Sequence, residues 1–195
     1  EAIVEDFEIK SKALKLTESR MRKDAILATN TSALSITELA KNLDRPEKFI
    51  GIHFFNPVHK MQLVEIVIGE ETSQDTIDTT INFVQKIGKL PVVVKDSPGF
   101  LVNRVLLPYL IEAIRLFSEG YSMQVIDNKM LNFGMPMGPL RLLDEIGLDV
   151  AAHVALDLEK RLKDFSTPKI LKEILLTKAL GRKGGRGGRQ SRRSG

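Results

Sequence analysis

Residues 49–68, FIGIHFFNPVHKMQLVEIVI, decide how this chain folds. Two runs rich in β-branched and aromatic residues flank a short polar segment, which is the pattern of two neighbouring β-strands. If the strands pair antiparallel about a turn centred on His59, His53 and Glu65 lie directly opposite each other. Directly opposed residues share one face of a sheet, with Cβ atoms about 4.5–5.5 Å apart. The spacing therefore predicts a carboxylate within reach of an imidazole.

Outward from this pair, the chain alternates strands and helices. Residues 25–30 form a short apolar run that ends in polar residues, which predicts a buried strand. A helix is expected to begin just after it, with Ser35 as N-cap and Glu38 as its capping-box partner. The other expected elements of this half are a helix over 5–20, a helix over 74–87 that Gly88 ends, and a strand over 90–94. This order predicts an α/β fold built on a sheet with parallel strands.

Beyond residue 95 the pattern becomes wholly helical. One long helix is expected over 100–120, with a broad buried stripe formed by Val105, Leu106, Tyr109, Leu110, Ala113, Ile114 and Phe117. The Gly/Pro-rich residues 134–139 predict a rigid turn that starts another helix, and further helices are expected after Asp149 and Pro168. We predict three parts: an α/β domain over 1–95, a helical domain over 96–180 and a disordered Gly/Arg tail over 181–195.

Charge separates the tail from the rest of the chain. The 195 residues have a formal net charge of +4, but the tail holds six Arg or Lys and no acid, which leaves 23 basic and 25 acidic residues over 1–180. The tail resembles Arg/Gly-rich nucleic-acid-binding segments, yet it lacks an aromatic residue to stack on a base, so we expect no nucleic-acid partner. The chain has no cysteine, no histidines at metal-ligand spacing and no apolar run of transmembrane length, so neither a metal site nor a membrane span is expected.

The predicted pair of His53 and Glu65 has two interpretations. A neighbouring carboxylate makes an imidazole more basic and stabilises its protonated form, as a general base that takes a proton from an alcohol requires. The alternative is a core histidine bonded to a structural acid. The spacing by itself does not choose between the two.

Five further polar residues are candidates for binding. Ser32 follows the first predicted strand, and ligands of open α/β sheets bind at the carboxyl ends of strands, although an ordinary turn also accounts for a serine there. Asn56 precedes a proline and is by default a turn residue. Asn103 is expected near a helix N-terminus, where its amide can meet an anionic or carbonyl oxygen or simply face solvent. Glu5 and Lys10 are interpreted as an exposed pair.

Several motifs, taken together, resemble the L-3-hydroxyacyl-CoA dehydrogenase family. They follow the family's order and spacing from residue 1 to about residue 188. These motifs are Asn30-Thr31-Ser32, Gly51-Ile52-His53-Phe54-Phe55-Asn56-Pro57, Leu63-Val64-Glu65, the run from Asp96 to Arg104 and the run from Gly134 to Pro139. The runs from Leu142 to Gly147 and from Gly181 to Gly185 are similar to the alpha-subunit branch of multifunctional fatty-acid oxidation complexes.

The resemblance implies NAD-dependent oxidation of L-3-hydroxyacyl-CoA to 3-oxoacyl-CoA in fatty-acid β-oxidation. It implies a Rossmann-like NAD-binding domain, partly present over 1–95, followed by a helical substrate and dimerisation domain. His53 matches the family's general base, and Glu65 matches the residue that orients it. Ser32 and Asn103 match substrate contacts, with Ser32 also near the nicotinamide. The other positions that match the family's NAD contacts are Glu5, Lys10 and Asn56.

The sequence also departs from the family. A member begins with a strand and a G-x-G-x-x-G loop whose amides cradle the pyrophosphate. Residues 1–195 contain neither this strand nor this loop, so the chain is expected to be a fragment. The resemblance implies an acyl-CoA substrate, a homodimer or a subunit of a fatty-acid oxidation complex, and the bacterial cytoplasm, or a mitochondrion or peroxisome in a eukaryote. The alternatives are a non-catalytic, crystallin-like relative that uses the scaffold for structure or assembly, and a fragment made inactive by the missing loop.

Overall fold

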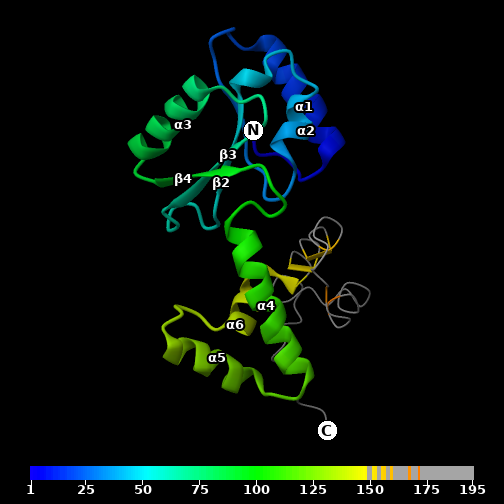
Figure 1. The fold of residues 1–195 in the computed structure, drawn as a ribbon, viewed down its shortest axis with the longest axis vertical. Coiled ribbons are helices and arrows are strands. Elements are labelled where there is room, and N and C mark those ends of the chain that lie inside the picture. Colours follow the sequence, from blue (N-terminus) through cyan, green and yellow to red (C-terminus); the bar gives the residue numbers. More distant parts are fainter. Residues whose placement is uncertain (149–150, 153–154, 157–158, 160–166, 168–170, 172–195) are drawn as a thin grey trace. The chain divides into compact units, whose positions relative to one another are not determined.

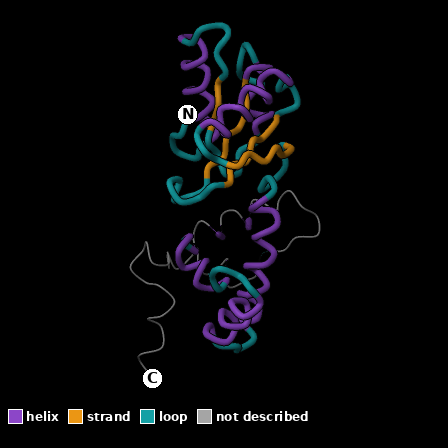
Figure 2. The backbone as a smooth tube through the Cα atoms, turned by 90° about the vertical axis from the view of Figure 1, so that its left-hand side faces the viewer, coloured by secondary structure: helices purple, strands orange, loops and turns teal. Residues whose placement is uncertain are grey.

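The computed structural model divides into two compact units (Figure 1). We call Glu1–Leu101 the sheet unit and Val102–Gly195 the helical unit. The residues that the structure describes are 1–148, 151–152, 155–156, 159, 167 and 171. Every strand among them belongs to the sheet unit, while the described residues of the helical unit form helices and loops (Figure 2). The predicted change from an α/β to an all-helical pattern is confirmed.

A four-stranded sheet forms the centre of the sheet unit, in the order β1-β2-β3-β4. The strands are β1 (Leu27–Thr29), β2 (Phe49–Phe54), β3 (Leu63–Ile68) and β4 (Leu90–Lys95). β1 runs parallel to β2, and β3 runs parallel to β4, while β2 and β3 are antiparallel. The sheet is therefore mixed, because the two strands that flank residues 55–62 pair with each other, as the spacing predicted.

Helices cover both faces of this sheet. α1 (Phe7–Arg20) and α2 (Ile36–Ala40) lie on one face, and α3 (Gln74–Lys86) lies on the other (Figure 1). Strand side chains point alternately to the two faces, so the core has two layers. The α1 and α2 layer includes Leu14, Ile36, Phe49 and Val67, and the α3 layer includes Ile50, Ile52, Val64, Ile66 and Val84. By this alternation His53 and Glu65 belong to the α1 and α2 face.

Local signals set the ends of these helices. Ser35 and Ser73 are the N-caps of α2 and α3, and each side chain accepts a hydrogen bond from the backbone N–H three residues later. The expected capping box of α2 is only half formed, because the Glu38 carboxylate binds Lys41, one turn further along, at 2.6 Å. Gly88 has a φ of +74° just after α3, as expected of a residue that ends a helix. A short 3-10 turn, Pro46–Lys48, leads into β2.

α2 packs directly against β2 because Gly51 has no side chain. A Cβ at Gly51 would lie 2.8 Å from Cδ1 of Ile36 and 2.9 Å from Cβ of Val67, distances at which one of these groups must move. The close approach places the start of α2, and the loop before it, beside the strand that carries His53.

The helical unit contains α4 (Val102–Ser118), α5 (Met123–Phe133) and α6 (Pro139–Ile146). Its buried core includes Leu107, Leu110, Ile111, Ile114, Ile126 and Leu143. The predicted stripe is confirmed at Leu110, Ala113 and Ile114 but is wrong at Val105, which is 68% exposed. Val105 lies about 200° around the helix from Leu107, at 100° per residue, and so faces away from the core.

The sequence predictions for the helical unit differ in outcome. The turn over 134–139 leads into α6, which begins at Pro139 as expected. α5 was not predicted as a separate helix, although Ser122 caps its start and Gly134, with a φ of +115°, ends it. The helices expected after Asp149 and Pro168 fall largely outside the described residues, and the tail over 181–195 falls wholly outside them. Among the described residues, no helix combines the length and apolar character needed to cross a membrane.

Candidate active site

β2 and β3 bring His53 and Glu65 together as a dyad. The two residues are direct partners in the antiparallel register, and Nδ1 of His53 lies 2.7 Å from Oε2 of Glu65. Both side chains are buried, with Glu65 0% and His53 5% exposed. The predicted contact is confirmed. A carboxylate so deeply buried is stable only where hydrogen bonds or charges compensate for its lost hydration.

The contact with Glu65 assigns different roles to the two ring nitrogens of His53. With Glu65 ionised, its carboxylate only accepts hydrogen bonds, and Nδ1 of His53 is then the donor. In the neutral ring Nε2 then has the free lone pair and can take a proton from a hydroxyl. The ring has two aromatic neighbours, with centroid distances of 4.5 Å to Phe55 and 5.9 Å to Phe100. These neighbours restrict the orientation of the imidazole.

Glu5 organises the loop that follows β1. Its Oε1 accepts hydrogen bonds from the N–H groups of Ser32, at 2.8 Å, and Ala33, at 3.3 Å. The same oxygen accepts from the hydroxyl of Thr31. Three donors on one oxygen fix the backbone that carries the half-buried Ser32. The Glu5 side chain stays 40% exposed, so it can still meet a ligand at this end of the sheet.

Lys10 lies beneath this loop and is fully buried, so the interpretation of an exposed pair is wrong for the lysine. Its Nζ lies 3.1 Å from Oε1 of Glu1 and 3.5 Å from Oε2 of Glu5. It also donates to the carbonyl oxygens of Ile3, at 3.3 Å, and Asn30, at 3.1 Å. These contacts tie the residues before α1 to the end of β1. Contact between Lys10 and NAD stays a prediction.

The contacts of Glu1 in this cluster lower the pKa of its carboxyl group. Burial by itself disfavours the ionised carboxyl of Glu1, but hydrogen bonds from the Thr29 hydroxyl, the Ile3 amide and the Lys10 ammonium outweigh it. Together they hold the pKa of Glu1 below its usual range. The carboxyl of Glu1 is therefore favoured in its ionised form inside the sheet unit.

The two predicted site asparagines, Asn56 and Asn103, lie in different units, and a third, Asn30, lies next to the dyad. Asn30, at the end of β1, accepts a hydrogen bond through Oδ1 from the N–H of Phe54 at 3.0 Å, which joins the carboxyl ends of β1 and β2 next to His53. Asn56 follows β2 and is exposed. Asn103 belongs to the helical unit, as the second residue of α4. Binding roles for Asn56 and Asn103 stay predictions.

Sequence reasoning missed the groups that support the site from the end of β4. The backbone N–H of Leu101 donates to Oε1 of Glu65 at 2.9 Å. Asp96 accepts hydrogen bonds through Oδ2 from the Ser35 hydroxyl, at 2.7 Å, and the Thr37 N–H, at 2.8 Å, and so anchors the start of α2. The sequence predicted a domain boundary near residue 95, but such a prediction does not tell in which direction an amide points.

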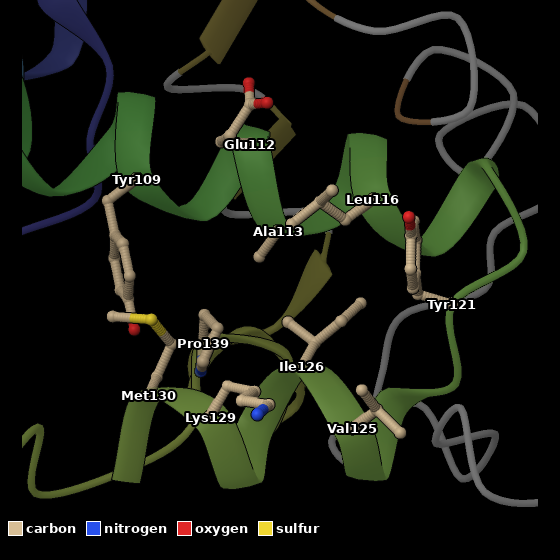
Figure 3. Close-up of a pocket in the computed structure, with 10 residues that line it drawn as sticks. All are labelled: Tyr109, Glu112, Ala113, Leu116, Tyr121, Val125, Ile126, Lys129, Met130 and Pro139. Atoms are coloured by element: carbon tan, nitrogen blue, oxygen red, sulfur yellow. The ribbon is translucent and has the colours of Figure 1, made fainter. Parts of the chain in front are cut away.

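The helical unit has a pocket of its own between α4 and α5 (Figure 3). Its volume is ≈ 360 Å³, and the described residues that line it are Tyr109, Glu112, Ala113, Leu116, Tyr121, Val125, Ile126, Lys129, Met130 and Pro139. Tyr109 points across it toward Met130 (Figure 3). Burial raises the pKa of the Tyr109 hydroxyl, and the charge of Asp127 adds to the rise. None of these described lining residues is a predicted site residue.

Two family models together match nearly the whole chain. Residues 1–97 match the NAD binding domain of 3-hydroxyacyl-CoA dehydrogenase, and residues 99–191 match its C-terminal domain. The chain belongs to the 3-hydroxyacyl-CoA dehydrogenase family. The family resemblance seen in the motifs is therefore confirmed, as is the Rossmann-like fold followed by a helical domain.

Curated bacterial relatives from this dehydrogenase family are much longer than this chain. The fatty acid oxidation complex subunit alpha of Acinetobacter baumannii (strain AYE) is 52% identical over 155 residues, which cover 80% of this chain and 22% of the relative. The subunit of the same name from Idiomarina loihiensis is 48% identical over 192 residues, which cover 96% of this chain and 27% of the relative. The chain thus spans about a quarter of the length of these relatives.

Solved structures of 3-hydroxybutyryl-CoA dehydrogenases have the same fold. The (S)-3-hydroxybutyryl-CoA dehydrogenase PaaH1 from Ralstonia eutropha is 41% identical with a TM-score of 0.91, and the match covers 94% of this chain and 66% of that one. The 3-hydroxybutyryl-CoA dehydrogenase from Escherichia coli is 36% identical with a TM-score of 0.89, covering 95% of this chain and 40% of that one.

NAD is the cofactor of the dehydrogenase family, and the residues present fit one part of it. β1 and β2 are parallel neighbours, and ligands of open α/β sheets lie at the carboxyl ends of such strands. That end carries the partly exposed carboxylate of Glu5, the half-buried Ser32 and the exposed amide of Asn56, which suit the hydroxyls and carboxamide of a nicotinamide riboside. These 195 residues contain no G-x-G-x-x-G loop to cradle a pyrophosphate.

Proposed function

We propose that this chain carries the proton-transfer site of an enzyme that oxidises the 3-hydroxyl of an L-3-hydroxyacyl-CoA to a ketone, with NAD as hydride acceptor. The observation that carries the proposal is the buried contact of 2.7 Å between His53 and Glu65, at the carboxyl end of β2. Family membership supports the reaction class. The names of the relatives support an acyl-CoA substrate and a role in fatty-acid oxidation.

His53 acts as the general base of this reaction. Its Nε2 accepts the proton of the 3-hydroxyl as C3 gives up a hydride, and NAD, when bound, would supply the acceptor for that hydride. The 3-hydroxyl thereby becomes a ketone, and His53 becomes an imidazolium. Glu65 keeps the other proton on Nδ1 and stabilises the imidazolium, because an opposite charge within hydrogen-bond distance favours the charged form. Burial strengthens that attraction, since the local dielectric is low.

The remaining polar residues are assigned to binding. Ser32 and Asn103 are the proposed contacts to the substrate hydroxyl and thioester. The proposed contacts to NAD are Glu5, Ser32 and Asn56, and Lys10 is the proposed support for them. Lys10 contributes from beneath the loop, because its ammonium fixes Glu5 and the carbonyl of Asn30. In this assignment residues 1–95 act as part of an NAD-binding domain and residues 96–180 as the helical substrate domain.

We further propose that the protein works as a subunit of a fatty-acid oxidation complex or as a homodimer, in a bacterial cytoplasm. Support comes from the bacterial relatives, which are named as alpha subunits of such a complex. Analytical ultracentrifugation of the protein purified from its own cells tests the assembly, and sedimentation at the mass of a single chain would contradict it.

The function is tested with acetoacetyl-CoA and NADH on the full-length product of the coding sequence that contains these residues. His53→Gln keeps a side chain of similar size but removes the proton-transferring nitrogen. We expect turnover to fall by about 10²–10⁴-fold. His59→Gln is the matched control, because His59 is exposed and lies outside the strands. Turnover of the His53 variant within about twofold of the control would overturn the proposal.

A further inference from the structure

Phe100 has a backbone conformation that its side chain disfavours. Its φ is +49°, whereas the other described residues with positive φ are all glycines. In a left-handed residue the Cβ crowds the backbone, so a bulky residue keeps this conformation only where the surrounding structure enforces it. Phe100 is 2% exposed, and Gly99 before it has a φ of +72°. Two successive left-handed residues thus turn the chain between β4 and α4.

This turn directs two groups at the dyad. The N–H of Leu101, which belongs to the peptide bond that follows Phe100, donates to Oε1 of Glu65 at 2.9 Å. The Phe100 ring lies edge-on to the imidazole of His53, with centroids 5.9 Å apart and planes inclined at 61°. Phe100 therefore packs its side chain on the base and directs the next amide at the acid.

We propose that Phe100 and Leu101 are positioning residues of the dyad, Phe100 through its left-handed backbone and Leu101 through its amide. With Oε1 bound to Leu101, Glu65 presents Oε2 to Nδ1 of His53. That arrangement keeps the proton of the neutral ring on Nδ1 and leaves Nε2 free to accept one. Without the Leu101 donor, the carboxylate has other rotamers to occupy, and the second tautomer of His53 becomes populated.

The tautomer ratio of neutral His53, measured by ¹⁵N NMR of the imidazole, tests the amide without requiring turnover. Leu101→Pro removes the N–H, and Leu101→Ala is its matched control, since it keeps the N–H and changes the same side chain, which is 46% exposed. Replacing the Leu101 amide by an ester also removes the N–H and keeps the leucine side chain, which guards against the proline ring displacing Phe100.

We expect the ratio of the Nδ1–H to the Nε2–H tautomer to fall about tenfold in the proline and ester variants and to stay unchanged in Leu101→Ala. Where the proposed dehydrogenase activity is measured, turnover should fall with the ratio while KM stays constant. A ratio in the ester variant equal to that of Leu101→Ala overturns the role of the amide, whatever the turnover. Absence of turnover in every variant, the parent included, would instead contradict the proposed function and leave the NMR result standing.

A second pair of variants tests the backbone of Phe100. Phe100→Gly and Phe100→Ala both remove the ring, but only glycine adopts a φ of +49° without strain. We expect the glycine variant to keep a tautomer ratio at least about threefold higher than the alanine variant and to melt at a higher temperature. Equal ratios, or a higher ratio in the alanine variant, would show that the left-handed backbone has no part in positioning the dyad.

Discussion

The sheet unit and the helical unit differ in how many polar groups they bury and in whether those groups have hydrogen-bond partners. Of the nine buried polar or charged residues in the described part of the chain, eight lie in the sheet unit. The buried side-chain atoms of the described residues that lack a hydrogen-bond partner all lie in the helical unit, namely Tyr109 Oη, Asp144 Oδ1 and Thr167 Oγ1. The described core of the helical unit is one apolar cluster. Among the described residues, buried polar groups are hydrogen-bonded or ion-paired in the sheet unit, whereas the unpaired ones lie in the helical unit.

The largest effect on stability is expected for Leu110→Ala in the helical unit. Leu110 is 2% exposed within the apolar cluster, so a cavity there should lower the free energy of unfolding by about 2–5 kcal/mol. Urea unfolding followed by tyrosine fluorescence measures it, because both tyrosines of the chain lie in the helical unit and there is no tryptophan. Leu131→Ala, at a site 45% exposed, is the control and should change stability by no more than about 0.5 kcal/mol. Equal midpoints for the two variants would contradict the role given to the cluster.

The matching test of the sheet unit is Glu18→Gln. The buried carboxylate of Glu18 accepts hydrogen bonds from the N–H groups of Asp44, at 2.9 Å, and Arg45, at 2.8 Å. Glutamine keeps one acceptor oxygen and replaces the other by an NH2 group that only donates, so one of the two bonds is lost and we expect a loss of about 1–3 kcal/mol. Far-UV circular dichroism should record this loss, while the tyrosine transition keeps its midpoint. Glu8→Gln, an exposed site on the same helix, is the control, and an equal loss there would show that the partners of Glu18 contribute nothing specific.

Removal of one buried hydroxyl group from each unit tests the contrast further. Thr76 is buried, and its hydroxyl donates to the carbonyl of Glu47 at 2.8 Å, so Thr76→Val should cost about 1 kcal/mol. Tyr109→Phe removes a buried hydroxyl that has no partner, so stability should stay constant or rise. Thermal melts of both variants measure these changes in stability. A larger loss of stability for Tyr109→Phe than for Thr76→Val would refute the contrast between the units.

The smallest expected effect is on the stability of the protein at low pH. The folded-state pKa of Glu1 is lowered, so its ionised carboxyl contributes stability above the ordinary glutamate pKa of about 4.3. That contribution is lost as the pH falls through the lower, folded-state value. Between about pH 6 and pH 3 the parent should therefore lose more stability than Glu1→Gln does, as measured by urea midpoints at each pH. The exposed Glu71→Gln is the control, and a pH dependence of Glu1→Gln equal to that of the parent would contradict the prediction.

The elements of the sheet unit and the dyad contact could be read from the sequence because both depend on local spacing. β3 spans the predicted residues, and the antiparallel register needed only the positions of His53, His59 and Glu65. Ser35 was recognisable as a cap for the same reason. The role of the dyad in catalysis did not follow from spacing, and it remains a proposal that family membership supports.

The sequence predictions that were wrong or missing concern features that local spacing does not determine. Lys10 lies in a helix with many charged residues, and its burial depends on Glu1 and on Asn30, which is 20 residues away. Val105 is apolar, but its angle on the helix decided its exposure. The direction of the Leu101 amide depends on backbone angles that no residue pattern specified. Contacts of this kind are set by tertiary packing, which local propensity does not encode.

The register of β2 and β3 has a consequence for the order of folding. His53 and Glu65 are only twelve residues apart, while Leu101 is 36 residues beyond Glu65. A hairpin forms in about 1–10 μs, and contacts between more distant residues form later because they close longer loops. We therefore expect His53 and Glu65 to meet early, when the hairpin forms. We expect the Leu101 amide to reach Glu65 only when the residues after β4 dock, so the proposed site is completed by a segment outside the two strands that carry the dyad.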